Sequence, residues 1–142
     1  MSSNRSGGFT LLELLVVISI MALAVAGVSL ALRDSGQTLL ERDAARLAAQ
    51  LEAGRAQSRA SGVPVVWRAV VGGFRWEGWP AVLDPQPWLD QGTSVVGPGL
   101  LRLGPEPLIG AQQVVLVNTS RPDQALRVST DGLRPFTVES QP

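Results

Sequence analysis

The sequence predicts an α+β protein: a long N-terminal helix, transmembrane in its first part and amphipathic in its second, packed on an antiparallel β-sheet or β-sandwich domain. Three observations predict this class. A charge-poor apolar run fills residues 9–32, apolar side chains at helical spacing follow within 33–62, and short β-branched segments broken by Gly and Pro fill 63–142. Residues 1–8 are a polar leader, and 142 residues suffice for one such domain.

The apolar run is long enough to span a membrane. Glu13 is its single charge, and the nineteen residues from Leu14 to Leu32 carry none. At about 1.5 Å per residue these span roughly 28 Å, close to the hydrocarbon core of a bilayer. Apolar side chains occur all round the predicted helix, as expected in lipid. Small residues in its second half would let another helix approach closely: Ala22, Ala24, Ala26, Gly27 and Ala31.

A second, amphipathic half of the helix is predicted over residues 39–60. The polar stretch 33–36 before it is a candidate weak point, because it ends in Gly. Apolar residues then recur at spacings of four, three and four: Leu40, Ala44, Leu47 and Leu51. Charged residues lie largely off this stripe: Glu41, Arg42, Arg46, Glu52, Arg55 and Arg59. Ser61-Gly62 followed by Pro64 predicts the helix end.

Short strands and turns are predicted from there to the C-terminus. Residues 63–71 are apolar and β-branched, and Gly72-Gly73 is a predicted hairpin turn into residues 74–76. Residues 80–107 are rich in Pro and Gly, which predicts loops with short strand pieces such as 100–103. Further strands are predicted at 114–117, 124–129 and 136–139, with a turn at Asp131-Gly132.

The composition argues against several functional classes. The chain has no Cys and no His, which excludes disulfides, thiolate or imidazole metal sites, and Ser-His-Asp or Cys-His catalysis. The net charge is zero and the β-rich part is close to neutral, so no nucleic-acid surface is expected. Six acids lie in loop-like sequence without the spacing of a calcium or glycosidase site: Glu77, Asp84, Asp90, Glu106, Asp123 and Asp131. We expect no enzyme activity, metal or cofactor.

The junction between the leader and the apolar run carries the most specific motif. Its residues, Gly8-Phe9-Thr10-Leu11-Leu12-Glu13, resemble the type III signal of type IV pilins and type II secretion pseudopilins. In that family a membrane-embedded aspartyl peptidase cleaves after the glycine and N-methylates the new first residue. The resemblance implies a prepilin leader of residues 1–8, cleavage between Gly8 and Phe9, methylation of Phe9, and a pilin-like fold.

The position of Glu13 fits this resemblance physically. A charged side chain in an apolar helix costs about 2.5–3.5 kcal/mol at the bilayer centre and less near the interface, so it normally has a partner. Phe9 and Glu13 are four residues apart and therefore share one helix face. The resemblance implies that Glu13 neutralises the N-terminal amine of a neighbouring subunit in the assembled fibre.

Alternative interpretations of the N-terminal segment stay open. A conventional secretory signal would combine Arg5, the apolar stretch and cleavage at Ala24-Val25-Ala26, but Glu13 interrupts that stretch and the stretch continues to Leu32. An ordinary single-span anchor would explain the hydrophobicity but not the motif. A secreted enzyme behind a signal peptide is a further alternative, although the chain lacks His, Cys and a paired-carboxylate motif.

Within the superfamily, the chain resembles the minor pseudopilin H group (GspH/FimT). The likeness lies in the Ala/Leu/Arg-rich helix at residues 41–56, the step from Ser61 to Val65, and the closing segment 126–136. It implies a minor pseudopilin of a type II secretion system, a low-copy subunit at or near the tip of the periplasmic pseudopilus that helps export folded proteins across the outer membrane. The alternative is a minor pilin (FimT/FimU-like) of a type IV pilus, acting in pilus assembly, twitching or DNA uptake.

The resemblance also implies location and partners. It predicts a single-pass protein of the bacterial inner membrane with its C-terminal domain in the periplasm, assembled into the pseudopilus. Partners are other major and minor pseudopilins, the prepilin peptidase and the inner-membrane secretion platform, with the secretin or cargo as further candidates. Residues 80–110 are the segment most free to vary, and Trp79 and Trp88 in or beside it are candidate contact residues. Tryptophans clustered in this way more often pack in a core.

Overall fold

A computed structural model describes residues 9–80 and 85–141, without the side chains of residues 32–35. The chain divides into two compact units, one ending at Ser35 and the other beginning at Gly36, and each is considered by itself. The leader, residues 1–8, lies outside the described residues. The predicted cleavage residue Gly8 lies outside them with it.

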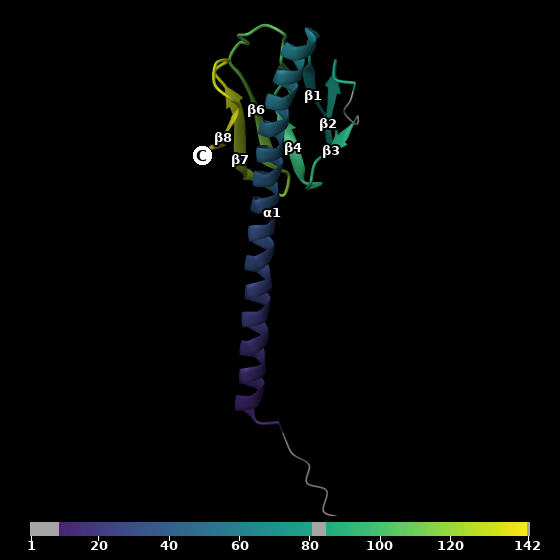
Figure 1. Cartoon of the computed structure of the whole chain (residues 1–142). Helices are drawn as coiled ribbons and strands as arrows, with labels where there is room; N and C mark the ends of the chain where they lie inside the picture. The colour runs from purple at the N-terminus through teal and green to yellow at the C-terminus, as the bar shows by residue number, and fades with distance from the viewer. Residues whose placement is uncertain (1–8, 81–84, 142) are drawn as a thin grey trace, which may run out of the picture. The chain divides into compact units, whose positions relative to one another are not determined.

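Helix α1, Leu11–Ser61, contributes to both units and confirms the prediction of one long helix (Figure 1). Its helical backbone continues through the polar stretch 33–36. Thr10 caps its start, because the Thr10 hydroxyl accepts a hydrogen bond from the Glu13 backbone N–H at 3.2 Å. Gly62 ends it, with a φ of 70° and an N–H that donates to the Ser58 carbonyl at 2.9 Å. That left-handed geometry is the one that favours Gly after a helix.

One antiparallel sheet of the second unit has the strand order β3-β2-β1-β5. Its strands are β1 (Val66–Val70), β2 (Gly73–Glu77), β3 (Gln86–Pro87) and β5 (Leu100–Arg102). The predicted turn at Gly72-Gly73 is shifted by one residue, because the turn is Val71-Gly72 and Gly73 already belongs to β2. A Cβ at Gly73 would lie 2.1 Å from the Gln86 carbonyl oxygen, so the close approach of β3 requires the glycine there.

The second antiparallel sheet has the order β4-β6-β7-β8. Its strands are β4 (Thr93–Val96), β6 (Gln112–Asn118), β7 (Arg121–Thr130) and β8 (Thr137–Gln141). The three predicted C-terminal strands correspond to β6, β7 and β8, and the predicted Asp131-Gly132 turn lies between the last two. Side chains of β6 and β7 alternate between buried and half-buried, which places one face of this sheet on the core.

The core forms where the second half of α1 meets the two sheets. All four residues of the predicted stripe (Leu40, Ala44, Leu47 and Leu51) are fully buried. Phe74 lies in an aromatic cluster, with ring centroids 5.9 Å from Trp67, 6.3 Å from Trp76 and 4.8 Å from Trp88. The helix passes close to this cluster at Gly54, where a Cβ would lie 3.0 Å from the Trp76 ring.

Candidate functional site

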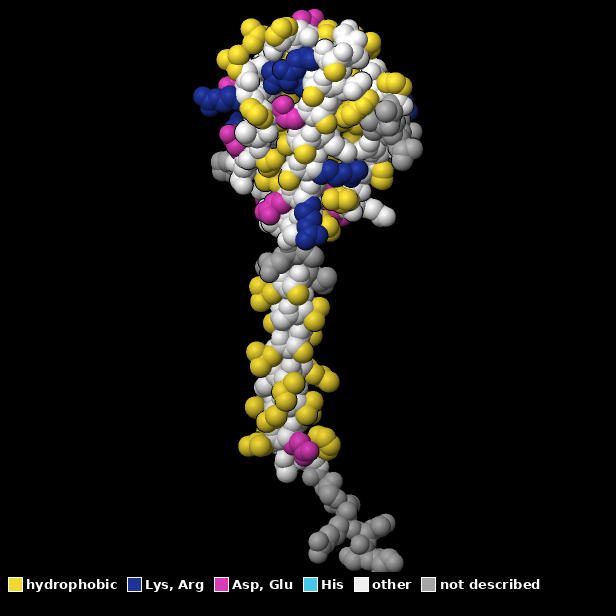
Figure 2. Space-filling model, in the orientation of Figure 1, with side chains coloured by type: hydrophobic (Ala, Val, Ile, Leu, Met, Phe, Trp, Pro, Cys, Tyr) yellow, Lys and Arg dark blue, Asp and Glu magenta, His cyan; other side chains and the backbone are white. Residues whose placement is uncertain are grey.

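The first half of α1 exposes its apolar side chains, and Figure 2 shows them along the face in view. All residues from Leu11 to Ala31 are exposed, and the helix is long and apolar enough to cross a membrane. Ser19 is polar, but its hydroxyl donates to the Leu15 carbonyl at 2.8 Å, so its donor is satisfied within the helix. A surface of this kind is unfavourable in water and favourable in lipid or among other apolar helices.

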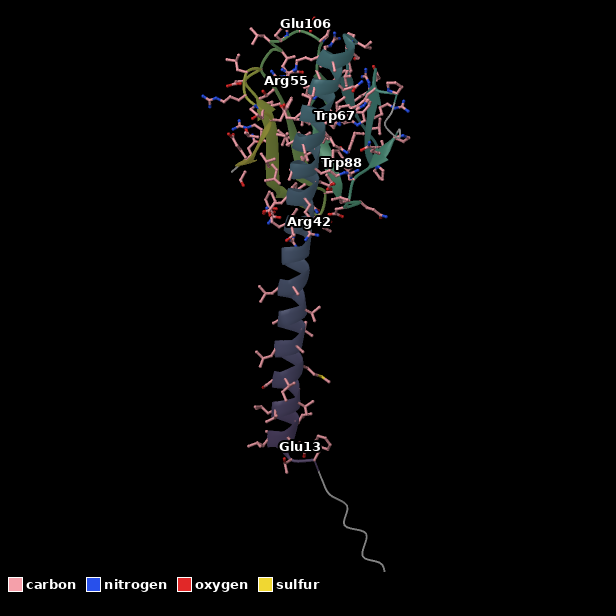
Figure 3. All side chains as sticks on the ribbon, viewed as in Figure 1. Glu13, Arg42, Arg55, Trp67, Trp88 and Glu106 are labelled. Carbon is pink, nitrogen blue, oxygen red and sulfur yellow. The ribbon has the colours of Figure 1, made fainter. Side chains whose placement is uncertain are left out.

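The first turn of α1 holds the charged end of this surface. Glu13 lies at the start of the helix, and its side chain is exposed (Figure 3). Thr10 and Glu13 have the spacing of a capping box, and a carboxylate in the first turn interacts favourably with the helix dipole. The cap uses only the backbone N–H of Glu13. Within residues 9–80 and 85–141 the Glu13 carboxylate makes no ion pair, so it remains available to an external cation.

Phe9 precedes the helix and is about three-quarters exposed. Its backbone nitrogen would become the N-terminal amine if the chain were cleaved after Gly8. Phe9, Thr10 and Glu13 together place an apolar side chain, a helix cap and a carboxylate at one end of an apolar surface. This arrangement suits insertion among helices and charge pairing at the end of the helix.

Two charged residues of α1, Asp43 and Arg55, are buried. The sequence pattern predicts Arg55 to lie off the apolar stripe and makes no prediction for Asp43. Asp43 accepts three hydrogen bonds, from the Leu89 N–H at 2.9 Å, the Asp90 N–H at 3.3 Å and the Thr93 hydroxyl at 2.8 Å. Its carboxylate therefore holds the segment between β3 and β4 against the helix. Asp43 lies three residues after Leu40 and four before Leu47, so its place beside the apolar stripe was visible in the spacing.

Arg55 is the second buried charge, at 3% exposure, where the sequence predicted a position off the stripe. It donates to the Gly132 carbonyl at 2.6 Å and to the Arg134 carbonyl at 3.4 Å. Glu52, one turn earlier, accepts the Phe136 N–H at 2.9 Å. These contacts hold the β7–β8 connection against α1 (Figure 3). Arg55 follows Leu51 by four residues, so helical periodicity places it on the buried face.

Trp79 and Trp88, the candidate contact residues, differ in how far the fold buries them. Trp88 is 7% exposed and belongs to the core (Figure 3), so an exposed contact role does not carry over to it. Trp79 is half-buried and stacks edge-on against Trp76, with ring centroids 5.1 Å apart. Burial follows because Trp88 sits beside Phe74, where β3 approaches the start of β2. Trp79 keeps partial exposure, so its contact role stays a prediction.

Of the six loop acids, Asp84 lies outside the described residues. Within the part of the chain that the structure describes, no three His, Cys, Asp or Glu side chains come together in a way that could hold a metal ion. Asp131 has a local role instead, because its carboxylate accepts the Arg134 N–H at 2.7 Å and the Leu133 N–H at 2.9 Å. These backbone hydrogen bonds lower the pKa of the Asp131 carboxyl below its ordinary value.

Comparison with known families agrees with the geometry of the N-terminal helix. Residues 3–29 match the prokaryotic N-terminal methylation motif, which covers the predicted cleavage junction and most of the apolar surface. No curated protein and no solved structure matches the chain. The motif supports a type IV pilin-like or pseudopilin-like protein, and it is consistent with membrane anchoring, processing by a prepilin peptidase and assembly with other pilin-like subunits.

Proposed function

We propose that this chain is a minor pseudopilin of a type II secretion system, with a structural rather than a catalytic role. One observation carries the proposal: a methylation motif leads into the first half of α1, residues 11–31, which exposes apolar side chains throughout and bears a single carboxylate at its start. The helix anchors the precursor in the inner membrane. After cleavage between Gly8 and Phe9 it packs among the helices of other subunits in the fibre.

Neutralisation of the Glu13 charge explains why the cleaved subunit assembles and the precursor does not. The carboxylate of Glu13 enters an apolar environment when the helix packs in the fibre, and an unpaired charge there is strongly unfavourable. Cleavage frees the α-ammonium of Phe9, and the subsequent N-methylation keeps its positive charge, so the Glu13 carboxylate of a neighbouring subunit can pair with it. An uncleaved precursor has no such amine beside its apolar helix, so it is excluded from stable assembly.

The second unit supplies the specific contacts of the subunit. Residues 36–141 build a separate core from α1 and the two sheets, so this unit can be displayed in the periplasm while the apolar helix is occupied. A tip or near-tip position in few copies follows from the resemblance to the H group. The lack of Cys favours a pseudopilin over the minor pilin alternative, because many pilins close a C-terminal disulfide loop.

Intact mass spectrometry of the membrane-extracted protein tests the processing. We expect a mature chain that begins at Phe9 and carries one N-methyl group, and Gly8→Ala should accumulate uncleaved precursor. A mature chain that begins after Ala26 would establish a conventional secretory signal and overturn the pilin-like assignment.

Deletion of the coding sequence in the source bacterium tests the system to which the subunit belongs. We expect reduced export of folded periplasmic proteins, while the major subunit still forms fibres. Complementation with the intact chain should restore export. Loss of twitching or DNA uptake with normal export would replace the pseudopilin assignment with that of a type IV minor pilin.

A further inference from the structure

The connection between β5 and β6 lies at the end of the domain where α1 ends, as the position of Glu106 in Figure 3 shows. Within residues 9–80 and 85–141, residues 104–109 of this connection make no hydrogen bond through backbone or side chain. A segment of this kind moves at little cost in free energy, because no hydrogen bond has to break. Residues 104–108 are called the strap below.

Both ends of the strap are held by the core. Leu103 is fully buried, and its backbone N–H donates to the Val65 carbonyl at 2.8 Å. Ile109 is buried at the other end. The side chain of Gln112 closes the base of the connection, because it accepts the Arg102 N–H at 2.7 Å and donates to the Arg102 carbonyl at 2.8 Å. Movement is therefore confined to the strap itself.

The strap is stiff in its middle and hinged at its start. Pro105 and Pro107 fix two backbone φ angles at about −65°. Gly104 has no side chain to restrict its backbone, and the Glu106 carboxylate folds back on it, where a Cβ would lie 2.0 Å from Glu106 Oε2. A short stiff segment that follows a small residue moves as a unit about that residue.

A hollow of about 440 Å³ lies between the strap and the start of β1. Pro64 and Val66 line it together with Leu108 of the strap. Pro64 is exposed and Val66 half-buried, and Leu108 is 65% exposed. Apolar side chains that share an open hollow gain free energy when they meet, because their contact removes apolar surface from water.

Two opposite charges line the same hollow without pairing. They are Arg102 of β5 and Glu106 of the strap, and both side chains are exposed. Neither makes an ion pair within the described ranges 9–80 and 85–141. Because β5 is fixed by its pairing with β1, movement of the strap changes the distance between the two charges.

We propose that the strap closes over this hollow, so that Leu108 packs on Pro64 and Val66 while the Glu106 carboxylate pairs with the Arg102 guanidinium. The structure shows the open form. Apolar contact and charge pairing favour the closed form, whereas hydration of the charges and side-chain freedom favour the open one. The strap thus exposes or withdraws an apolar side chain at this end of the domain.

Distances between spin labels on the full chain in detergent micelles test the proposal. Because the chain has no Cys, Val63→Cys and Pro107→Cys carry the only two labels, one beside the hollow and one on the strap. In the control pair Leu133→Cys replaces Pro107→Cys, because Arg55 holds the β7–β8 connection in place. We expect two distance populations for the first pair, the shorter one being the closed form, and a single population for the control pair.

Substitutions that remove the closing contacts should shift the two populations. Leu108→Ser should lower the ratio of closed to open form about tenfold, and Glu106→Gln should lower it about two- to fivefold. Exchange of the two charges, Arg102→Glu with Glu106→Arg, should restore the ratio. Glu139→Gln on β8 removes the ion pair with Arg127 and should leave the ratio unchanged.

Salt separates the ion pair from the apolar contact. About 1 M salt should lower the closed fraction of the chain with Glu106 but not that of Glu106→Gln, because salt screens exposed charges. A single distance for the labels at 63 and 107 would overturn the proposal. So would two populations whose ratio neither Leu108→Ser nor Glu106→Gln changes, in variants whose unfolding midpoints match that of the unsubstituted chain.

Discussion

Three carboxylates on the same helix show how strongly position decides what a residue does. Glu13 is exposed at the start of an apolar surface, Asp43 is buried with three hydrogen-bond donors, and Glu52 accepts a backbone N–H from the segment before β8. The first is available to an external cation. The other two are used inside the domain to hold segments that are distant in sequence.

The role of Glu13 is tested by Glu13→Val. We expect membrane insertion and cleavage to continue, because the substitution makes the helix more apolar, while incorporation into fibres falls by about tenfold or more through the lost charge pair. Quantitative blotting of sheared fibres against the membrane fraction measures this. Glu13→Asp, which keeps a carboxylate, should retain part of the incorporation. Normal incorporation of Glu13→Val would show that the carboxylate has no partner.

Asp43 should matter for stability rather than for assembly. Asp43→Ala leaves two backbone N–H groups and a buried hydroxyl without their acceptor, so we expect a loss of about 2–3 kcal/mol in the free energy of unfolding. Urea unfolding followed by tryptophan fluorescence measures this loss. Arg42→Ala, at the exposed neighbouring position, is the control and should change stability by less than about 0.5 kcal/mol. Equal effects of the two substitutions would contradict the buried role.

At the scale of elements, helix α1 is defined by its two ends and by two different environments along its length. Thr10 caps the start and Gly62 ends the helix in a left-handed conformation. Between them the apolar half is exposed throughout, whereas the second half buries one face on the sheets. The same helix is therefore long and apolar enough to cross a membrane in its first half, and it is a core element in its second.

Two glycine substitutions, one at the end of α1 and one in the connection between β5 and β6, form a matched pair. Gly62→Ala forces a β-carbon into a φ of 70° and should destabilise the domain by about 1–2 kcal/mol. Gly110→Ala meets nothing within 4 Å and has no left-handed φ, so it should be neutral or raise stability by up to about 1 kcal/mol. Thermal unfolding monitored by circular dichroism compares them. A loss at Gly110 equal to that at Gly62 would refute the conformational explanation.

At the scale of the whole molecule, the chain consists of two compact units that differ in whether their apolar side chains are exposed or buried. The unit from Gly36 onward contains every buried apolar residue of the described core, from Leu40 to Phe136. The unit that ends at Ser35 has none of them and exposes its apolar side chains. The second unit therefore has the core needed to fold without the first.

Removal of the first unit tests this separation. A fragment of residues 35–142 should be soluble and monomeric, with circular dichroism that shows both helix and strand and a cooperative thermal transition. The full chain, by contrast, should require detergent. A fragment that is disordered, or helical without strand, would show that the apolar helix is needed for folding of the β-rich domain.

Much of this architecture follows from local sequence. Helix α1 is determined locally, because each of its signals depends on neighbours within one or two helical turns. The apolar run and the capping pattern at Thr10 determine where it begins, the Gly62 stop where it ends, and the periodic stripe from Leu40 which face it buries. The turn at Asp131-Gly132 is likewise local. The motif at Gly8 to Glu13 indicates the pilin-like class from six consecutive residues.

Tertiary structure decided what local sequence does not encode. Four features depend on segments more than thirty residues apart or on cross-strand pairing. They are the strand orders, the shift of the hairpin turn to Val71-Gly72, the burial of Arg55, and the place of Trp88 in the core instead of at a contact surface. The choice of β3, β5, β4 and β8 as edge strands is of the same kind. An edge exists only once every other strand has found its partner, because backbone hydrogen bonds between strands are satisfied by the assembled sheet and not by the strand that contributes them.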